Sequence, residues 1–532
     1  MKYRKTVLCV LLCVLLTACG AKQKPNPEPE LPEPAVQAAG TAAPVPENAV
    51  LYLGAPKEET QPSEPEPEKT DETQYAGTPA PEPEETAKPS VRKLAGNAYS
   101  ADVSELVTDC GSYVRSCRTY DCSDGCTVQL LRAEGLAEKL VFCSETLPET
   151  GGISYYDPSG EWKHIPLTEG SWQTQVLMLR TDGGRNYFIY TPRTYTQLEN
   201  HVLDHRTAEG GAVTLKKTES GWLLEVTGTI RETAGLCDCL ILSSENALEN
   251  WDCDNCAMAW QRYMTNHQGH MCYDGFYYTA PDSYIPTGPD CYYRCAASYI
   301  VKVSEGRIGY DPCAPALTVA LLDTVAQVQN GYGYWETGAV SQWLSGDYGI
   351  GAGFYDTRFN TDLMEIFCLT NEALGGGLFH DAIGTYLDFY LRMAAECHYE
   401  KNGGWLIPDY WWPGTFIKPH TALNHQAAEC LQLYRLSEML GREDTRELAD
   451  RLLLGMTETA DGYIMPDHNL HYCVRPDFTY GLDDYPELTY NDLLALDRYL
   501  IEKRGAGEPK LEMLMAEKKI WMDANGVTTY NK

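Results

Sequence analysis

The sequence predicts an α+β multidomain protein, in which an N-terminal antiparallel β-sandwich or barrel is followed by an α/α-toroid-like helical domain. Two patterns along the chain indicate this. Before about residue 305, short apolar runs alternate with a period of two and are separated by glycine-rich turns. After about residue 310, apolar residues recur at the three- and four-residue spacing of helices.

The β-rich domain is expected to span residues 96–305. Its clearest strands are residues 175–179, 186–190 and 221–227. In the last of these, Trp222, Leu224 and Val226 fall on one face, because side chains alternate along a strand. The pattern therefore predicts strands with one buried face, as in a sandwich or barrel.

The helical domain is expected to span residues 306–532. Gly441 lies where a helix C-terminal cap is expected. Asp362 is predicted to cap the second helix, with Glu365 completing a capping box. Long aromatic loops between the helices favour paired hairpins in a toroid over a tight bundle. The seven expected helices are 313–329, 361–374, 378–398, 420–440, 443–456, 486–503 and 508–522.

Residues 1–19 are predicted to be a lipoprotein signal peptide. Three basic residues precede an apolar run that is too short to span a bilayer, and the segment ends in Leu16-Thr17-Ala18-Cys19-Gly20. This end resembles the bacterial lipobox. The resemblance implies that Cys19 carries diacylglycerol and palmitate, and that the protein is anchored in the lipid bilayer at the extracellular face of the cell membrane. The alternative is an ordinary signal peptide with an incidental cysteine.

Residues 20–95 are predicted to be a disordered linker rich in proline and glutamate, because they contain too few apolar residues to offset the entropy of ordering. The whole chain has a formal net charge of -33, and most of it falls outside the linker. A surface of this sign repels phosphate backbones, so nucleic acid is excluded as a partner.

Seventeen cysteines follow residue 109. In an exported protein this number indicates disulfides, although an anaerobe could also keep the thiols reduced. The close pairs Cys253/Cys256 and Cys291/Cys295 could instead hold zinc. The sequence leaves these three interpretations open.

Aromatic side chains with polar tips are unusually common, with 36 Tyr and 11 Trp against 10 Phe. Such rings match the apolar faces and hydroxyl rims of sugars. They are concentrated in four predicted loops, at 273–286, 332–337, 351–362 and 404–412, and near the helix start at 420–426. The candidate substrate-binding residues from these segments are Tyr277, Tyr334, Trp335, Tyr355, Trp405, Tyr410, Trp412 and Asn424.

Acid–base candidates lie in the same segments. In Asp356-x-Arg358-x-x-x-Asp362, the arginine could grip a sugar carboxylate while a neighbouring aspartate exchanges a proton, or it could form a structural ion pair. His420 and His425 could transfer protons, form a structural pair, or bind zinc together with Asp467 or His468. The full set of catalytic candidates is Asp356, Arg358, His420, His425, Asp409 and Glu336.

The segments Gly404-Trp405 and Leu423-Asn424-His425-Gln426, in this order of domains, resemble the glucuronyl epimerase group and, more broadly, toroid-fold glycan lyases and hydrolases. The resemblance implies an enzyme acting on a polysaccharide or oligosaccharide, by uronate epimerisation, elimination or glycoside cleavage. The alternative is a non-catalytic lipoprotein that binds glycans or the cell wall. No phosphate loop, dinucleotide fingerprint or nucleophile elbow is present in the sequence, and no cofactor or metal is expected.

Overall fold

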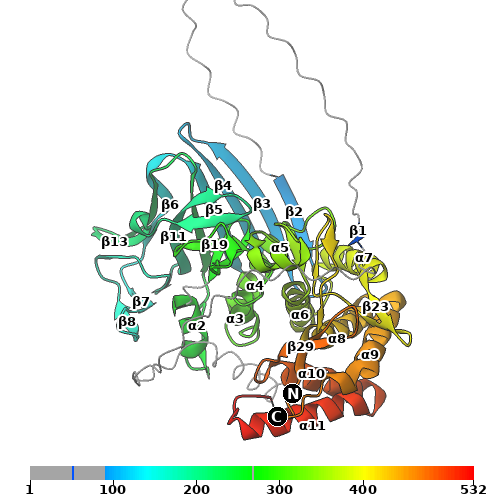
Figure 1. Ribbon diagram of the computed structural model, residues 1–532. Coiled ribbons are helices and arrows are strands. Elements are labelled where there is room, and N and C mark those ends of the chain that lie inside the picture. Colours follow the sequence, from blue (N-terminus) through cyan, green and yellow to red (C-terminus); the bar gives the residue numbers. More distant parts are fainter. Residues whose placement is uncertain (1–50, 53–89, 254, 266–268, 532) are drawn as a thin grey trace, which may run out of the picture.

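The computed structural model describes residues 51–52, 90–253, 255–265 and 269–531. Most strands lie on one side of the molecule and the longer helices on the other (Figure 1). The sequence prediction of both antiparallel sheets and helices is confirmed. The predicted signal peptide with Cys19 and most of the predicted linker lie outside the described residues. The first long strand begins at Ser90, earlier than the expected linker boundary at residue 95.

A 13-stranded sheet forms the centre of the β-rich part, and its strands pair antiparallel. Its main path runs in the order β16-β17-β19-β12-β11-β15-β5-β4-β3-β2, with β10, β7 and β8 joined at β11. The strands of this large sheet are β2 (Ser90–Ala95), β3 (Ser100–Asp109), β4 (Tyr113–Cys122), β5 (Cys126–Gly135), β7 (Gly151–Tyr156), β8 (Trp162–Pro166), β10 (Val176–Thr181), β11 (Asn186–Leu198), β12 (Val202–His205), β15 (Gly235–Ser244), β16 (Gly269–Cys272), β17 (Gly275–Thr279) and β19 (Cys291–Arg294).

A second sheet has the order β6-β14-β13-β9 and shares a hydrophobic core with the large sheet. In β14, Trp222, Leu224 and Val226 are buried in this core, as the alternating pattern predicts. All ten residues of β15 are buried, because the other face of the large sheet is covered by helices. The second sheet contains β6 (Ala137–Leu147), β9 (Gly170–Trp172), β13 (Ala212–Thr218) and β14 (Gly221–Ile230), and the 3-10 turn η1 (Thr207–Glu209) precedes β13.

The seven expected helices are all present, with ends shifted by a few residues, and three short helices were not predicted. The expected helices are α4 (Ala314–Ala326), α6 (Thr357–Ala373), α7 (His380–Cys397), α8 (Leu423–Leu440), α9 (Glu443–Tyr463), α10 (Leu488–Arg504) and α11 (Pro509–Ala524). The additional helices are α2 (Cys256–Thr265), α3 (Val301–Glu305) and α5 (Gln342–Tyr348).

Helix caps agree with the sequence in one place and differ in another. Gly441 ends α8 in the left-handed conformation, with φ of 66°. The prediction that Asp362 caps α6 is wrong, because the helix begins earlier. Asp356 is the N-cap, and its carboxylate accepts a hydrogen bond from the Phe359 N–H at 3.1 Å.

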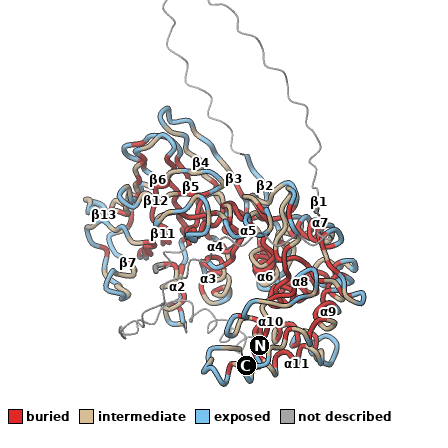
Figure 2. Tube along the Cα trace, viewed as in Figure 1, coloured by how far each residue is buried: buried red, intermediate tan, exposed pale blue. Residues whose placement is uncertain are grey.

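The helices form one continuous core with the large sheet. Helix α8 packs against α6, α9 and α10, and α4 packs against β5 and β17. Buried segments follow the central strands and the inward faces of α4, α6 and α8 (Figure 2). No helix in the described part of the chain combines the length and apolar character needed to cross a membrane. Closure of the helices into a toroid stays a prediction.

Five small sheets connect the helices. The one that matters for the site has the order β20-β22-β25, and we call it the site sheet. Its strands are β20 (Glu336–Thr337), β22 (Phe354–Asp356) and β25 (Tyr410–Trp411). The others pair β18 (Tyr284–Ile285) with β21 (Val340–Ser341), β23 (Tyr399–Lys401) with β24 (Gly404–Leu406), β1 (Leu51–Tyr52) with β26 (Phe416–Ile417), and β27 (Thr421–Ala422) with β28 (His471–Val474) and β29 (Tyr480–Asp483).

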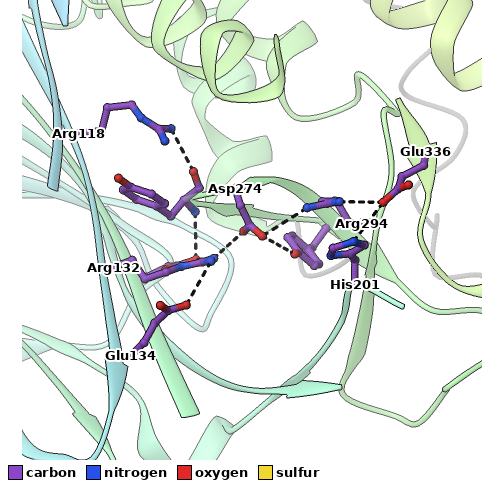
Figure 3. A network of polar contacts seen from close by, with 10 residues as sticks. Arg118, Arg132, Glu134, His201, Asp274, Arg294 and Glu336 are labelled. Carbon is purple, nitrogen blue, oxygen red and sulfur yellow. Dashed lines mark hydrogen bonds and ion pairs between the residues drawn. The ribbon is translucent and has the colours of Figure 1, made fainter. Parts of the chain in front are cut away.

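A chain of ion pairs joins the large sheet to the site sheet (Figure 3). Arg132 donates two hydrogen bonds of 2.7 Å to Asp238 and one of 2.6 Å to Asp274. Asp274 also lies 3.6 Å from Arg294, which donates a 3.0 Å hydrogen bond to Glu336 on β20. Because Arg132 and Asp238 are buried, each depends on the other for its charge to be tolerated.

Two carboxyl groups of this ion-pair chain, Asp274 and Glu336, remain ionised although they are partly buried. Burial alone would raise the pKa of Asp274, but the charges of Arg132 and Arg294 outweigh it and lower that pKa. The hydrogen bond from His201 outweighs burial at Glu336 and, with the charge of Arg294, lowers the pKa of Glu336. Their contribution to stability is therefore present near neutral pH and is lost as the pH falls through these lowered values.

We expect Arg132→Leu to lower the free energy of unfolding by about 3–5 kcal/mol, because it leaves the buried Asp238 carboxylate without its partner. Lys216→Ala is the control, since Lys216 forms an exposed cross-strand pair with Glu225. That change should cost at most about 1 kcal/mol. Denaturant unfolding followed by circular dichroism measures both, and equal small effects would contradict the assigned role of Arg132.

Candidate functional site

The site sheet has two different faces, and the predicted site residues divide between them. Asp356 is paired in register with Tyr410, while Tyr355 is paired with Glu336 on one side and with Trp411 on the other. Because side chains alternate along a strand, Asp356 and Tyr410 project from one face and the other three from the opposite face. We call the face of Asp356 and Tyr410 the site face.

Asp356 lies where β22 runs into α6. It is 6 % exposed, and its carboxylate caps the helix by accepting from the Phe359 N–H. Burial, together with the negative charges of Asp409 and Asp362, raises the pKa of Asp356 to about 7. The group can therefore hold a proton near neutral pH and also release it.

Asp409 is fully buried at the N-terminus of α8. One carboxylate oxygen accepts a 2.8 Å hydrogen bond from the Ala422 N–H. The other lies 3.3 Å from Nε2 of His420 and 3.5 Å from Nδ1 of His425. The backbone carbonyl of Asp409 accepts from the Thr357 N–H at 2.9 Å, so the residue also contacts the start of α6. That second oxygen and Nε2 of His420 have no hydrogen-bond partner in the described part of the chain, so Asp409 acts on the two imidazoles through its nearness and charge.

His425 is held in one orientation. Its Nδ1 lies 2.8 Å from the hydroxyl of Thr357, and no hydrogen-bond partner for its Nε2 is found among the described residues. Burial lowers the pKa of His425 to about 4, although the negative charge of Asp409 opposes this. The imidazole is therefore neutral at physiological pH and can accept a proton.

Aromatic side chains surround these groups. We call Trp343, Tyr348, Tyr410, Tyr472 and Tyr485 the aromatic rim. The ring centroids of the first four lie 5.9–6.2 Å from that of His420. Tyr485 contacts Tyr472 with ring centroids 5.6 Å apart. Trp343 is 42 % and Tyr485 52 % exposed, so the rim reaches the protein surface.

Arg358 is close to the site but is already engaged. Its Nε donates to Asp362 at 3.0 Å, and its Nη1 donates to Asp492 at 2.6 Å. The hypothesis that Arg358 grips a sugar carboxylate is therefore not supported by its geometry. Arg358 instead forms the structural ion pair with Asp362 that the sequence offered as the alternative. It also pairs with Asp492, which the sequence did not suggest.

Several predicted substrate-binding residues belong to the core instead. Tyr277, Tyr334, Trp335 and Tyr355 are at most 2 % exposed. Tyr277 donates to Asp274, Tyr334 to the Gly353 carbonyl, and Trp335 to the Val325 carbonyl. Aromatic side chains with polar tips fit the core here because each tip finds a partner.

Three other candidates, Glu336, Trp405 and Trp412, have contacts elsewhere and none with the side chains of His420 or His425 among the described residues. Glu336 pairs with Arg294 and His201 and borders a very small cavity beside Trp335. Trp405 stacks on His398 with ring centroids 3.7 Å apart, and Trp412 donates to the Ala352 carbonyl. The contacts of Glu336, Trp405 and Trp412 therefore join parts of the protein to one another.

Asn424 is 1 % exposed, and its Oδ1 has no hydrogen-bond partner in the described part of the chain. It precedes His425 on α8, so its side chain points in a different direction from that of His425 around the helix axis. Its predicted contact with substrate stays a prediction.

The aromatic rim contains residues that the sequence did not single out. Trp343 and Tyr348 lie on α5, whose seven residues are too few to show a clear helical period. Tyr472 lies on the four-residue strand β28, which pairs with β27 beside His420. Only a strand pairing across about 50 residues of sequence brings it there, so no local signal was available.

No metal site was found in the described residues. No group of three or more His, Cys, Asp or Glu side chains in residues 51–52, 90–253, 255–265 and 269–531 is arranged to hold a metal ion. His468 instead pairs with Glu517 on the surface, at 2.6 Å. All 17 cysteines in this part of the chain carry free thiols, so the disulfide interpretation is not supported.

No protein-family model matches this sequence, and no curated protein sequence is significantly similar to it. Solved structures similar to it include the cellobiose 2-epimerase of Bacillus thermoamylovorans B4167, with 11 % identity, a TM-score of 0.36, and coverage of 50 % of this chain and 68 % of the epimerase. A family 76 glycoside hydrolase from a bovine Bacteroides thetaiotaomicron strain has 9 % identity, a TM-score of 0.36, and coverage of 74 % and 75 %.

The unsaturated glucuronyl hydrolase of Bacillus sp. GL1 has 13 % identity and a TM-score of 0.29, with 43 % of this chain and 60 % of the hydrolase covered. A D-mannose isomerase is covered over 57 % of its length. By their names, these proteins act on carbohydrates. Because each TM-score is low, the case for a function of this chain rests on its own side chains.

The raised pKa of Asp356 predicts how stability changes with pH. Between about pH 4 and pH 7 the folded protein keeps a proton on this carboxyl that the unfolded chain has lost, so stability falls as the pH rises through this window. In Asp356→Asn this fall is absent, while the amide oxygen can still cap α6. From pH 5 to pH 8, wild type should lose about 2–3 kcal/mol of unfolding free energy relative to the variant.

Urea unfolding of both proteins at the two pH values measures this difference. Asp381→Asn is the control, because Asp381 is exposed in the first turn of α7. Its pH profile should parallel that of wild type. A parallel profile for Asp356→Asn as well would contradict a proton held by Asp356.

Proposed function

We propose that this protein is an acid–base enzyme acting on carbohydrate chains. The observation that carries the proposal is that a protonatable carboxyl, Asp356, and a neutral imidazole, His425, both lie close to the buried Asp409. The two residues begin α6 and α8, and Thr357 and Asp409 hold these helix starts together. Neither side chain depends on a loop tip for its position.

The two groups suit opposite roles in proton transfer. Asp356 has a pKa near 7 and can donate a proton to a departing oxygen. In the tautomer in which Nδ1 donates to the Thr357 hydroxyl, the neutral ring of His425 presents Nε2 as an acceptor. Environments that separate the pKa values of two groups are typical of acid–base pairs. Glycoside cleavage and epimerisation or elimination at a ring carbon all need such a pair.

The aromatic rim supports a carbohydrate as the substrate. Sugar rings stack their C–H faces on aromatic side chains and bond through hydroxyls at the edge. Trp343 and Tyr485 offer exposed rings, while Tyr410 and Tyr472 lie between them and the buried carboxylates. We infer that these rings line the approach to Asp356, at one end of a toroid-like arrangement of the helices.

The second candidate is a non-catalytic glycan-binding protein that uses the same rim. One observation favours it: Asp356 caps α6, and this role alone accounts for its position. Loss of the Asp356 carboxyl would abolish turnover if the protein is an enzyme. It would leave glycan binding unchanged if the protein only binds.

We expect Asp356→Asn to lower kcat on a responsive oligosaccharide by at least about 100-fold, the usual size of an acid–base contribution, and to leave binding within about threefold. Product formation and calorimetric binding over a panel of oligosaccharides measure the two effects. If glycans bind and no product forms in wild type, the binding protein is the correct function.

Trp343→Ala should weaken binding of the same oligosaccharide by about tenfold or more, as expected for a lost stacking ring. Tyr332→Ala is the matched control. Tyr332 is also 42 % exposed, but it contacts Trp411 on the opposite face of the site sheet. Equal losses in both variants would contradict binding at the aromatic rim.

We further propose that Cys19 anchors the protein to the extracellular face of the cell membrane. The support is the lipobox-like Leu16-Thr17-Ala18-Cys19-Gly20 after a basic and apolar segment. An anchored enzyme would meet polysaccharides at the cell surface, reached through the proline- and glutamate-rich segment that follows.

Cys19→Ser should move the full-length protein out of the membrane fraction and abolish its labelling by palmitate, when it is produced in a bacterium that acylates lipoproteins. Cys13→Ser is the matched control, because it removes a thiol of the same apolar segment. Fractionation and metabolic labelling measure both. Unchanged labelling of Cys19→Ser would contradict the anchor.

A further inference from the structure

We infer that the site takes a neutral sugar, and that the residue bound against Asp356 and His425 is not a uronate. This inference rests on the proposed function and narrows its substrate class. It follows from the charges around the site face in the described part of the chain, where Arg358 is engaged by two carboxylates and Arg475 is exposed to water.

A uronate needs a cation against its carboxylate, and a buried or half-buried arginine is the usual provider because its fork binds both oxygens. Arg358 follows Asp356 by two residues, in the first turn of α6. All three of its nitrogens are engaged, Nε at 3.0 Å from Asp362 and Nη1 and Nη2 at 2.6 and 3.5 Å from Asp492. These three residues carry a net charge of -1, which offsets the surplus of +1 left by Lys302 and Arg435 around the single carboxylate of Glu365. This group of six side chains therefore offers no surplus cation to a substrate carboxylate.

The next cations are no more available. Lys302 lies 3.3 Å from Glu365, and Arg435 lies 3.7 Å from the same carboxylate. Arg475 is exposed and forms no ion pair with a described residue. Its guanidinium donates to the Tyr480 carbonyl at 3.3 Å, near the outer edge of Tyr348. A carboxylate bound there would remain in water, where one ion pair contributes little.

Buried carboxylates, in contrast, lie next to Asp356. After burial itself, the negative charges of Asp409 and Asp362 raise the pKa of Asp356, so a carboxylate bound against Asp356 would meet the same repulsion. The protein as a whole has a formal charge of -33, so long-range attraction of an anionic polymer is absent too. A neutral sugar avoids this repulsion and uses what the site offers, which is aromatic faces, tyrosine hydroxyls, a protonated carboxyl and an imidazole.

The inference also selects among the reactions. Elimination and C5 epimerisation of a uronate both draw on the substrate carboxylate to acidify the neighbouring C–H, and that carboxylate must be held by a cation. With no such cation at the site face, glycoside cleavage or epimerisation of a neutral sugar remains. In cleavage, Asp356 gives its proton to the departing oxygen as the glycosidic bond breaks, and His425 takes a proton from the attacking water.

Linkage-matched glycan pairs test the inference. Polygalacturonate and hyaluronan oligosaccharides are each compared with their carboxyl-reduced forms, and chitin with chitosan oligosaccharides, within an array of neutral, uronate and amino-sugar glycans. The full-length protein should bind the neutral member of a responsive pair at least tenfold more tightly. Preference for the uronate or for the ammonium form overturns the inference while leaving a glycan-directed function intact.

Arg475→Gln is the accompanying variant, because it removes the exposed cation and leaves Asp356, His425 and the aromatic rim unchanged. Its affinity for neutral glycans should stay within about twofold of wild type. Its affinity for uronate glycans should stay as weak as that of wild type. Uronate binding that disappears in Arg475→Gln would overturn the inference. Absence of binding to every glycan of the array would instead overturn the proposed function, and the inference with it.

Discussion

The site depends on one buried carboxylate. Asp409 contacts the first residues of α6 through its backbone and the first residues of α8 through its side chain. The N-terminus of α8, which carries partial positive charge, therefore faces the carboxylate and helps a fully buried aspartate to be tolerated, while the start of α6 donates to the backbone carbonyl. Both imidazoles, of His420 and His425, lie within 3.5 Å of the second carboxylate oxygen.

A second constraint keeps the site sheet in place. Glu336 on β20 is bound by Arg294 of the large sheet, and β20 is hydrogen-bonded to β22, which carries Asp356. The ion-pair chain through Asp274 and Arg132 reaches strands β5 and β15 in the centre of the large sheet (Figure 3). The β-rich part thus supports the acid–base pair although it contributes neither of the two side chains. This arrangement explains why charged residues are retained in a core that apolar side chains could fill.

Polar aromatic residues have two separate roles in this protein. Tyr277, Tyr334 and Tyr355 direct their hydroxyls to partners inside the core, where phenylalanine would leave those partners unpaired. Trp343 and Tyr485 are exposed beside the three half-buried tyrosines of the aromatic rim. The surplus of tyrosine over phenylalanine therefore reflects internal hydrogen bonding as much as a ligand-binding surface.

The sequence by itself determined the secondary structure. Alternation in 221–227 predicted β14, and the spacing of apolar residues predicted α4 and α6 to α11, because burial of one face follows from local periodicity. Asp356, Asp409, His420 and His425 were also among the six catalytic candidates, since they lie in the aromatic loops or near the start of a predicted helix. Only the tertiary structure decided which of these residues meet. Arg358 is neutralised by Asp492, 134 positions away, and Tyr472 reaches His420 through a strand pairing, and neither contact has a local signal. Register in the site sheet separates Asp356 from Glu336, because adjacent positions of a strand face opposite sides.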